Sequence, residues 1–394
     1  MDVEGLKNVQ RFVKRQLAAA PLSDNLDGGP GSGNFGHAGR PGKRGGSASG
    51  GGAAYSYAGV DLNDPGNKYL LKKLPVKDGV KSLEDAVKEA RAKNAGGTLS
   101  NEDFIAVGES LANDYAIRHN RIVDELEETE TRMNKEINEL EARQNELFMA
   151  MITIPPEERP KHGFGTEEEM NAEMDSISER LGKIMESPEY KADLQKVEQL
   201  TDALADPVEN AAALADSLRK VRKVGLDGVT ADEVLFGMPQ DKDVVDSVAN
   251  ALDYYPTSWI NASKNSGNVV VRPLSEDRGL YNADNNSIDS DGTLETGIHE
   301  LAHRFEKVYS EVKIAEREFY EKRTQGEPLT QITGARPGEM CRKDNFIYEY
   351  MGKDYGGSFY ELASMGFEMA YTDPARLAQD PEMQCWIYGM LALL

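Results

Sequence analysis

Apolar residues recur at steps of three and four between residues 82 and 222, a spacing that predicts α-helix. One run, separated by Glu, Arg, Lys and Asn, comprises Ile122, Leu126, Met133, Ile137, Leu140 and Leu147. A second run comprises Met170, Met174, Ile177, Leu181 and Ile184, and the helix-breaking residues between the two are Pro155, Pro156, Pro160, Gly163 and Gly165. Two such seams flanking a loop predict a long antiparallel helical hairpin of coiled-coil type within residues 82–225. A hairpin of this kind is typical of assembly, so we expect an oligomer formed through it.

The spacing of the apolar residues changes after the shorter helices expected between residues 208 and 254. Val269, Val270 and Val271 form a β-branched run, and a second short run is centred on Ile288. Helical spacing returns from about residue 294 and again from 357 to 394. These patterns predict an α+β fold that is mainly α. We expect residues 226–394 to form a separate domain with a small β-sheet.

The N-terminal part of the chain has a different composition. Residues 1–22 contain an amphipathic pattern with a basic face, which predicts a short helix that docks on a partner or on the rest of the chain. Residues 23–58 are dominated by glycine, and almost nothing in them could fill a core. We expect this segment to be a flexible linker.

Charge and composition exclude several classes of function. The formal net charge of −23 argues against sequence-independent nucleic-acid binding, because the phosphates would be repelled. There is no run of about 18 apolar residues, so no membrane span is expected, and the N-terminus lacks a signal-peptide core. With two cysteines, Cys341 and Cys385, no disulfide framework is implied.

A short histidine motif carries the strongest chemical signal. Two of the five histidines, His299 and His303, lie four residues apart around Glu300. Residues at this spacing share one face of a helix, so both imidazoles can reach a single ion. Imidazole nitrogens suit Zn²⁺, and Glu300 is placed to act as general base toward a water at the metal. A structural zinc site would usually have four protein ligands, commonly with a cysteine pair, so we expect catalytic zinc.

The third metal ligand has to come from elsewhere. Glu306 shares the face of the two histidines, but it lies about 10 Å along the helix axis from His299, too far for one ion. A second expected helix carries two candidates, Glu361 and Glu368.

The motif His-Glu-Leu-Ala-His followed some sixty residues later by Glu361-x-x-Ser364 resembles the gluzincins, zinc metallopeptidases whose third ligand is such a glutamate. The resemblance implies a zincin-like domain with Glu361 as the third ligand. Glu368, seven residues on and on the same face, is the fallback ligand and otherwise a residue that supports the ligands or lies on the surface. Glu306 is a further candidate for a supporting residue. The motif departs from the thermolysin pattern because no aspartate stands four residues after Glu361 to orient a ligand histidine.

Two further segments resemble proteins of tailed phages. The segment Gly-Pro-Gly-Ser-Gly-Asn-Phe-Gly-His-Ala-Gly-Arg-Pro-Gly is similar to one in portal and head-morphogenesis proteins. Residues 252–394 look like a peptidase-like module of phage head proteins, with Arg278-Gly279-Leu280-Tyr281 and Tyr350-Met351-Gly352-Lys353-Asp354-Tyr355 among the matching words. The resemblance implies phage head and portal proteins as partners, and a location in the virion or the bacterial host cytoplasm.

These observations predict a zinc-dependent endopeptidase that acts on a protein or peptide substrate. Tyr350 or Tyr355 is a candidate to stabilise the oxyanion, with core packing as the alternative. The strand at residues 268–272 is either an edge to which substrate adds or a core strand, and Trp259 is expected to be packing. The rival functions are a zinc-binding head protein that cleaves nothing and an injected phage effector.

Overall fold

The computed structural model describes residues 65–394 except 96 and 275–278. The predicted N-terminal helix (1–22), the glycine-rich linker (23–58) with its phage-like segment, and Arg278 lie outside the described residues. The described part is mainly helical with a small sheet, which confirms the α+β class at that level. None of the described helices is both long enough and apolar enough to cross a membrane.

The elements before the sheet are almost all helical. In chain order they are η1 (Pro65–Leu71), α2 (Leu83–Lys93), α3 (Asn101–Thr153), η2 (Arg159–His162), α4 (Glu167–Glu186), α5 (Pro188–Ala205) and α6 (Pro207–Arg219). The remaining elements are η3 (Ala231–Glu233), β1 (Leu235–Gly237), η4 (Pro239–Asp241), α7 (Lys242–Leu252), α8 (Thr257–Asn265), β2 (Val269–Pro273), β3 (Leu280–Asn282), β4 (Ser287–Ser290), α9 (Leu294–Val308), α10 (Ser310–Arg323), β5 (Leu329–Gln331), β6 (Met340–Arg342), η5 (Glu349–Gly352), α11 (Leu362–Thr372), α12 (Pro374–Leu377) and α13 (Pro381–Leu393).

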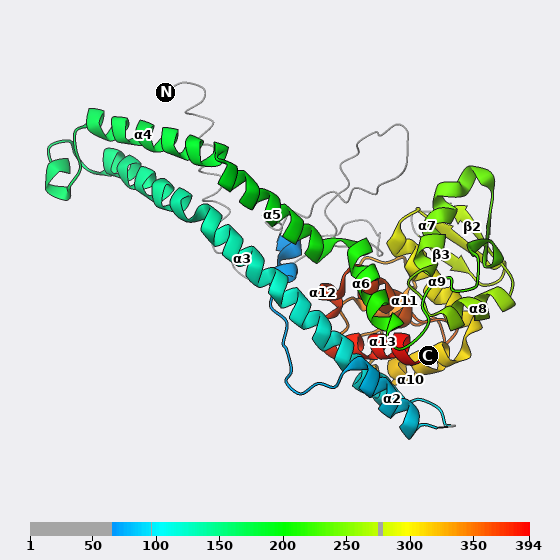
Figure 1. The fold of residues 1–394 in the computed structure, drawn as a ribbon. Helices are drawn as coiled ribbons and strands as arrows, with labels where there is room; N and C mark the ends of the chain where they lie inside the picture. Colours follow the sequence, from blue (N-terminus) through cyan, green and yellow to red (C-terminus); the bar gives the residue numbers. More distant parts are fainter. Residues whose placement is uncertain (1–64, 96, 275–278) are drawn as a thin grey trace. The chain divides into compact units, whose positions relative to one another are not determined.

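Helix α3 is 53 residues long, and α4 and α5 run back along it (Figure 1). It begins at a capping box in which the Ser100 and Asp103 side chains bond each other's backbone N–H groups. It ends before Pro155, because proline disfavours the helical conformation in the residue that precedes it. The two apolar seams meet in a small core of Leu147, Ala150, Met170 and Ile177. Exposed ion pairs also connect α3 with the returning helices, namely Arg143–Glu173, Arg180–Glu136 and Arg132–Asp193.

The sheet has the strand order β1-β2-β4-β3. Strands β1, β2 and β4 are parallel, and β3 pairs antiparallel with β4 at one edge. Strand β2 therefore lies between β1 and β4, so residues 268–272 belong to a core strand and the edge alternative is wrong. The physical reason is β1, a three-residue strand too short to show a period in the sequence, which covers the far side of β2.

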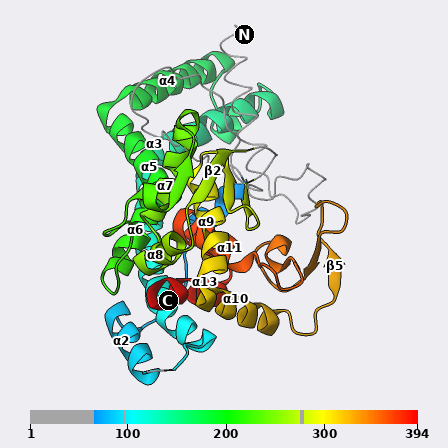
Figure 2. The same ribbon diagram turned by 90° about the vertical axis from the view of Figure 1, so that its right-hand side faces the viewer.

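The main hydrophobic core draws on residues from both sides of residue 225. Helix α2, the first turns of α3, and α6 pack into the same cluster as α7, α8, α9, α11 and α13. Trp259 is fully buried in this cluster, as expected for a packing residue. Helix α11 lies beside α9 (Figure 2). This contact brings the segment with Glu361 and Glu368 to the histidine motif.

Candidate metal centre

The histidine motif lies in the middle of α9. The helix begins where predicted, with the Thr293 side chain accepting a hydrogen bond from the Thr296 N–H as N-cap. Ile298, Leu301 and Phe305 are fully buried and hold one face of α9 in the core. The His299 and His303 side chains, on a neighbouring face, keep 17% and 12% of their surface exposed. The core thus fixes the helix while both imidazoles remain within reach of solvent.

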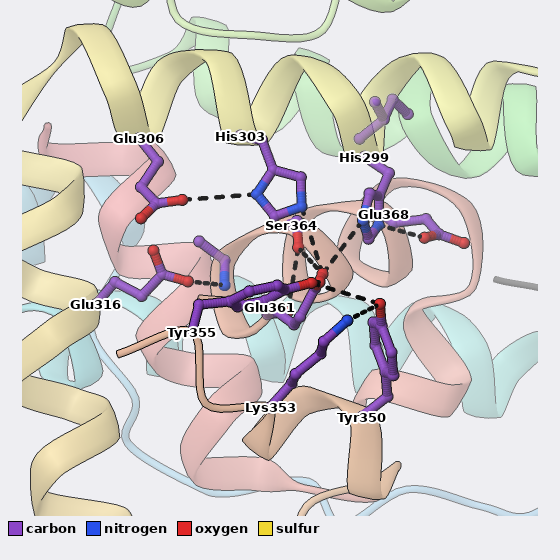
Figure 3. Close-up of polar contacts among 12 residues, drawn as sticks. His299, His303, Glu306, Glu316, Tyr350, Lys353, Tyr355, Glu361, Ser364 and Glu368 are labelled. Carbon is purple, nitrogen blue, oxygen red and sulfur yellow. Dashed lines mark hydrogen bonds and ion pairs between the residues drawn. The ribbon is translucent and has the colours of Figure 1, made fainter. Parts of the chain in front are cut away.

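Both imidazoles face one carboxylate oxygen (Figure 3). Glu361 Oε2 lies 3.4 Å from His299 Nε2 and 3.3 Å from His303 Nε2. One ligand atom from each of the three residues falls within 4.8 Å of the others, a cluster able to hold a metal ion. Glu361 is the N-cap residue of α11, one residue before the helix itself.

The outer nitrogen of each imidazole meets a second carboxylate. His299 Nδ1 lies 3.0 Å from Glu368 Oε2, and His303 Nδ1 lies 3.5 Å from Glu306 Oε2. Glu368 and Glu306 therefore sit behind the rings and do not join the group that faces Glu361. A carboxylate hydrogen-bonded in this position, as Glu368 is to His299, orients a ligand imidazole and sets its tautomer in known metal sites. Glu368, seven residues after Glu361, makes this contact with His299 from the same segment.

The electrostatics of the group favour bound positive charge. Burial by itself lowers the pKa of His299, but hydrogen bonds to Glu361 and Glu368 outweigh it and raise this pKa to about 10. Burial likewise opposes the shift at Glu361, yet the two imidazoles hold the pKa of its carboxyl well below the usual range. A divalent cation held between the three side chains would supply such a positive charge.

The two distances from the imidazoles to Glu361 match those between neighbouring ligand atoms of a tetrahedral zinc ion. Two ligand atoms at the usual zinc distance of about 2.0–2.1 Å are about 3.4 Å apart across a tetrahedral site. The two measured separations to Glu361 Oε2 are 3.4 and 3.3 Å. Two imidazole nitrogens and one carboxylate oxygen also form the donor set of catalytic zinc sites, which leave a fourth position for water or substrate. The residues present fit zinc.

Glu300 lies near both the three-residue group and the edge strand of the sheet, since its carboxyl interacts electrostatically with His299, His303 and Glu361. Its side chain is buried, and burial raises the pKa of its carboxyl, while the backbone N–H of Tyr281 in β3 donates to it and opposes that shift. A Cβ at Gly279 would lie 2.6 Å from Thr296 Cγ2 and 2.7 Å from Glu300 Oε1, so a larger residue in the chain leading into β3 would displace these side chains. The carboxylate is thus held between the histidine motif and the edge strand.

Both tyrosines named from the sequence lie at the centre. The Tyr355 hydroxyl donates to Glu361 Oε1, and the Tyr350 and Tyr355 hydroxyl oxygens are 3.4 Å apart. Ser364, the other residue of the Glu361-x-x-Ser364 motif, donates to Glu361 Oε2 at 3.0 Å. Glu361 therefore has a hydrogen-bond donor on each oxygen, which orients the carboxylate.

Two residues near the centre were missed in the sequence. Lys353 is buried and contacts both tyrosines, and Glu316 of α10 is fully buried, with Oε1 accepting the Ala363 N–H at 2.7 Å. Lysine and glutamate are usually solvated, so their residue types alone predict exposure. For Glu316, the helical spacing that places it in register with the buried Val312 and Phe319 was the available signal.

Replacement of Glu316 by glutamine should stabilise the metal-free protein more at pH 8 than at pH 5. Burial and the nearby Glu306 carboxylate raise the pKa of Glu316 well above its usual value. The folded state then holds a proton that the unfolded state releases, so stability falls as pH rises between the two pKa values, by at most about 1.4 kcal/mol per pH unit. Glutamine keeps the acceptor for Ala363 and does not titrate. Urea denaturation at both pH values measures the difference.

Glu318→Gln is the matched control, because Glu318 is exposed on the same helix. It should shift the free energy of unfolding equally at pH 5 and pH 8. A pH-independent difference for Glu316→Gln as well would show that the buried carboxyl does not retain its proton.

No protein-family model, curated protein or solved structure was found to match this chain.

Proposed function

We propose that this protein is a zinc-dependent endopeptidase in which His299, His303 and Glu361 hold the metal. The observation that carries the proposal is the convergence of these three side chains on one point, with Glu300 buried beside them. A purely structural zinc site has no use for an additional carboxylate held at its edge. Glu300 therefore favours the enzyme over the rival reading of a zinc-binding protein that cleaves nothing.

Each residue has a distinct role in the proposed hydrolysis. When bound, zinc supplies Lewis acidity that polarises the scissile carbonyl and makes water a better nucleophile near neutral pH. Glu300 accepts the proton of the attacking water and then delivers it to the leaving amine. Its raised pKa, caused by burial, brings this carboxyl closer to the pH at which it must do both. Tyr355 donates its hydroxyl hydrogen to the carbonyl oxygen as negative charge develops there.

The edge strand β3 offers a place for an extended substrate. It pairs with β4 on one side, and Glu300 accepts a hydrogen bond from its Tyr281 N–H. A peptide that adds to β3 as a further strand would gain main-chain hydrogen bonds and run past Glu300. This position replaces residues 268–272 as the proposed substrate edge.

The wider setting is proposed from the sequence resemblance. We place this gluzincin-like, zincin-type domain in a phage head or head-morphogenesis protein, in the virion or the host cytoplasm, with head and portal proteins as partners. The paired helices α3 and α4–α5 would serve assembly, in keeping with coiled-coil oligomers. These helices equally suit a structural head protein, and an injected effector would share the same chemistry.

Purified protein should contain about one zinc ion per chain. A chelator should remove this zinc and abolish the cleavage of an unfolded protein such as casein. Removing one ligand by Glu361→Gln should leave little zinc after dialysis, whereas Glu368→Gln should weaken zinc binding about 10–100-fold. Mass spectrometry of metals and competition with a chromogenic chelator measure both. An exposed glutamate in α10, Glu311, provides the control. Wild-type protein that binds no zinc would refute the proposed centre.

A further inference from the structure

Lys353 is the only lysine among the buried residues of the described chain. It directly follows η5, and its side chain is 6% exposed. The ammonium donates to Glu339 Oε1 at 2.7 Å and to the Tyr350 hydroxyl at 2.8 Å. It also lies 4.5 Å from the ring centroids of both Tyr350 and Tyr355. Figure 3 shows it below Tyr355 and beside Tyr350, on the side of Glu361 away from α9.

Holding an ammonium in this place is costly, because a buried charge loses its hydration. The ion pair with Glu339 offsets part of this loss, and two aromatic faces contribute cation–π attraction. An apolar side chain of similar length would fill the same volume without that cost. A functional role for the charge would explain why the protein retains a buried ammonium despite this free-energy cost. The two aromatic side chains that the ammonium contacts both belong to the candidate centre.

The hydrogen bonds from Lys353 to Glu361 run in one direction. An ammonium can only donate, so the Tyr350 oxygen accepts, and the Tyr350 hydrogen turns to another acceptor. The Tyr355 oxygen, 3.4 Å away, lies in that direction, and Tyr355 in turn donates to Glu361 Oε1. A donor that itself accepts a hydrogen bond from a cation is polarised and donates more strongly.

We propose that Lys353 is a positioning residue that holds and polarises the Tyr350–Tyr355 pair for stabilisation of the oxyanion. The inference rests on the proposed peptidase function. In the ground state Tyr355 donates to Glu361, and as the substrate carbonyl oxygen gains negative charge this donor turns to it. Lys353 forms no covalent bond and transfers no proton. Its charge, held behind the two phenols, is of the sign that the developing oxyanion requires.

The test is a double-mutant cycle of Lys353→Met and Tyr355→Phe in the zinc-loaded full chain, with labelled casein as substrate. Lys353→Met should lower kcat about 10–100-fold, with KM and zinc content unchanged. In the Tyr355→Phe background it should cause little further loss, because the group through which it acts is gone. Lys343→Met is the control, since Lys343 also pairs with a glutamate, Glu349, but is 44% exposed. It should leave kcat unchanged.

Losses that simply multiply in the double variant would overturn the inference, as would an unchanged kcat in Lys353→Met. If Lys353→Met does not fold, Tyr350→Phe replaces it, because it removes the hydroxyl that links Lys353 to Tyr355 and keeps the ring. The same cycle then applies, with the same two outcomes.

A second readout separates this inference from the proposed function. In metal-free protein labelled with ¹³Cζ-tyrosine, the Tyr355 resonance is assigned by its loss in Tyr355→Phe. Lys353→Met should shift that resonance, whereas Lys343→Met should leave it in place. Absence of casein cleavage in the wild type would refute the peptidase alone. An unmoved Tyr355 resonance would refute the positioning role alone.

Discussion

Replacement of Glu300 by glutamine is expected to abolish peptide hydrolysis while the protein keeps its zinc. Glutamine has nearly the same shape and can still accept the Tyr281 N–H, but it cannot take a proton from water. Loss of a general base typically lowers the rate about 10²–10⁴-fold. The metal should stay, because the facing ligand atoms belong to His299, His303 and Glu361. Cleavage of labelled casein measures the rate of hydrolysis, and metal analysis of the same preparation measures the zinc content.

The fragments themselves provide a sharper criterion. Wild type and Glu300→Gln are purified in parallel, and peptides from casein and from the chain itself are identified by mass spectrometry. Fragments that appear only with wild-type protein and vanish with chelator would support the enzyme. Identical fragments in both preparations would show that a contaminant made them, and the peptidase proposal would fail while the zinc centre could stand.

Gly389→Ala is expected to destabilise the protein by about 3 kcal/mol or more, because overpacking at a rigid contact has no cheap relief. A Cβ on Gly389 of α13 would lie 1.8 Å from the Phe104 carbonyl oxygen of α3. From the other helix, a Cβ on Gly108 would lie 1.7 Å from the Cys385 carbonyl oxygen. The two helices thus touch backbone to backbone, and a methyl group would force them apart. Chemical denaturation followed by circular dichroism measures the loss.

Gly182→Ala is the matched control for this effect. Gly182 is an exposed glycine within α4, and a Cβ there would meet nothing within 4 Å. Alanine should therefore stabilise the protein by about 0.5–1 kcal/mol through its better helix propensity. Opposite signs at the two positions are the expected result. Stabilisation by Gly389→Ala would mean that α3 and α13 do not pack as closely as the structure has them.

The position of β2 in the sheet and the set of helices that form the main core could not be predicted from the local sequence pattern. Val269, Val270 and Val271 read as a strand from their side chains alone, but an edge strand and a central strand can share that pattern. Only the pairing of β2 with β1 decides between them. The predicted boundary at residue 225 followed the change of period, whereas the main core takes in helices from both sides of it. The spacing of apolar residues describes single helices and strands, and it carries no information on which of these elements share a core.

The sequence by itself determined the features that arise within one element: the helical seams, the start of a helix near residue 294, and the placement of His299 and His303 on one face of that helix. These follow from the 3.6-residue period and local hydrogen bonding. Only the tertiary structure decided which of Glu361 and Glu368 faces the inner imidazole nitrogens, because both lie on one short segment and the docking of α11 on α9 selects between them. It alone also revealed the burial of Lys353. That burial depends on contacts between segments, which a pattern of residue types does not encode.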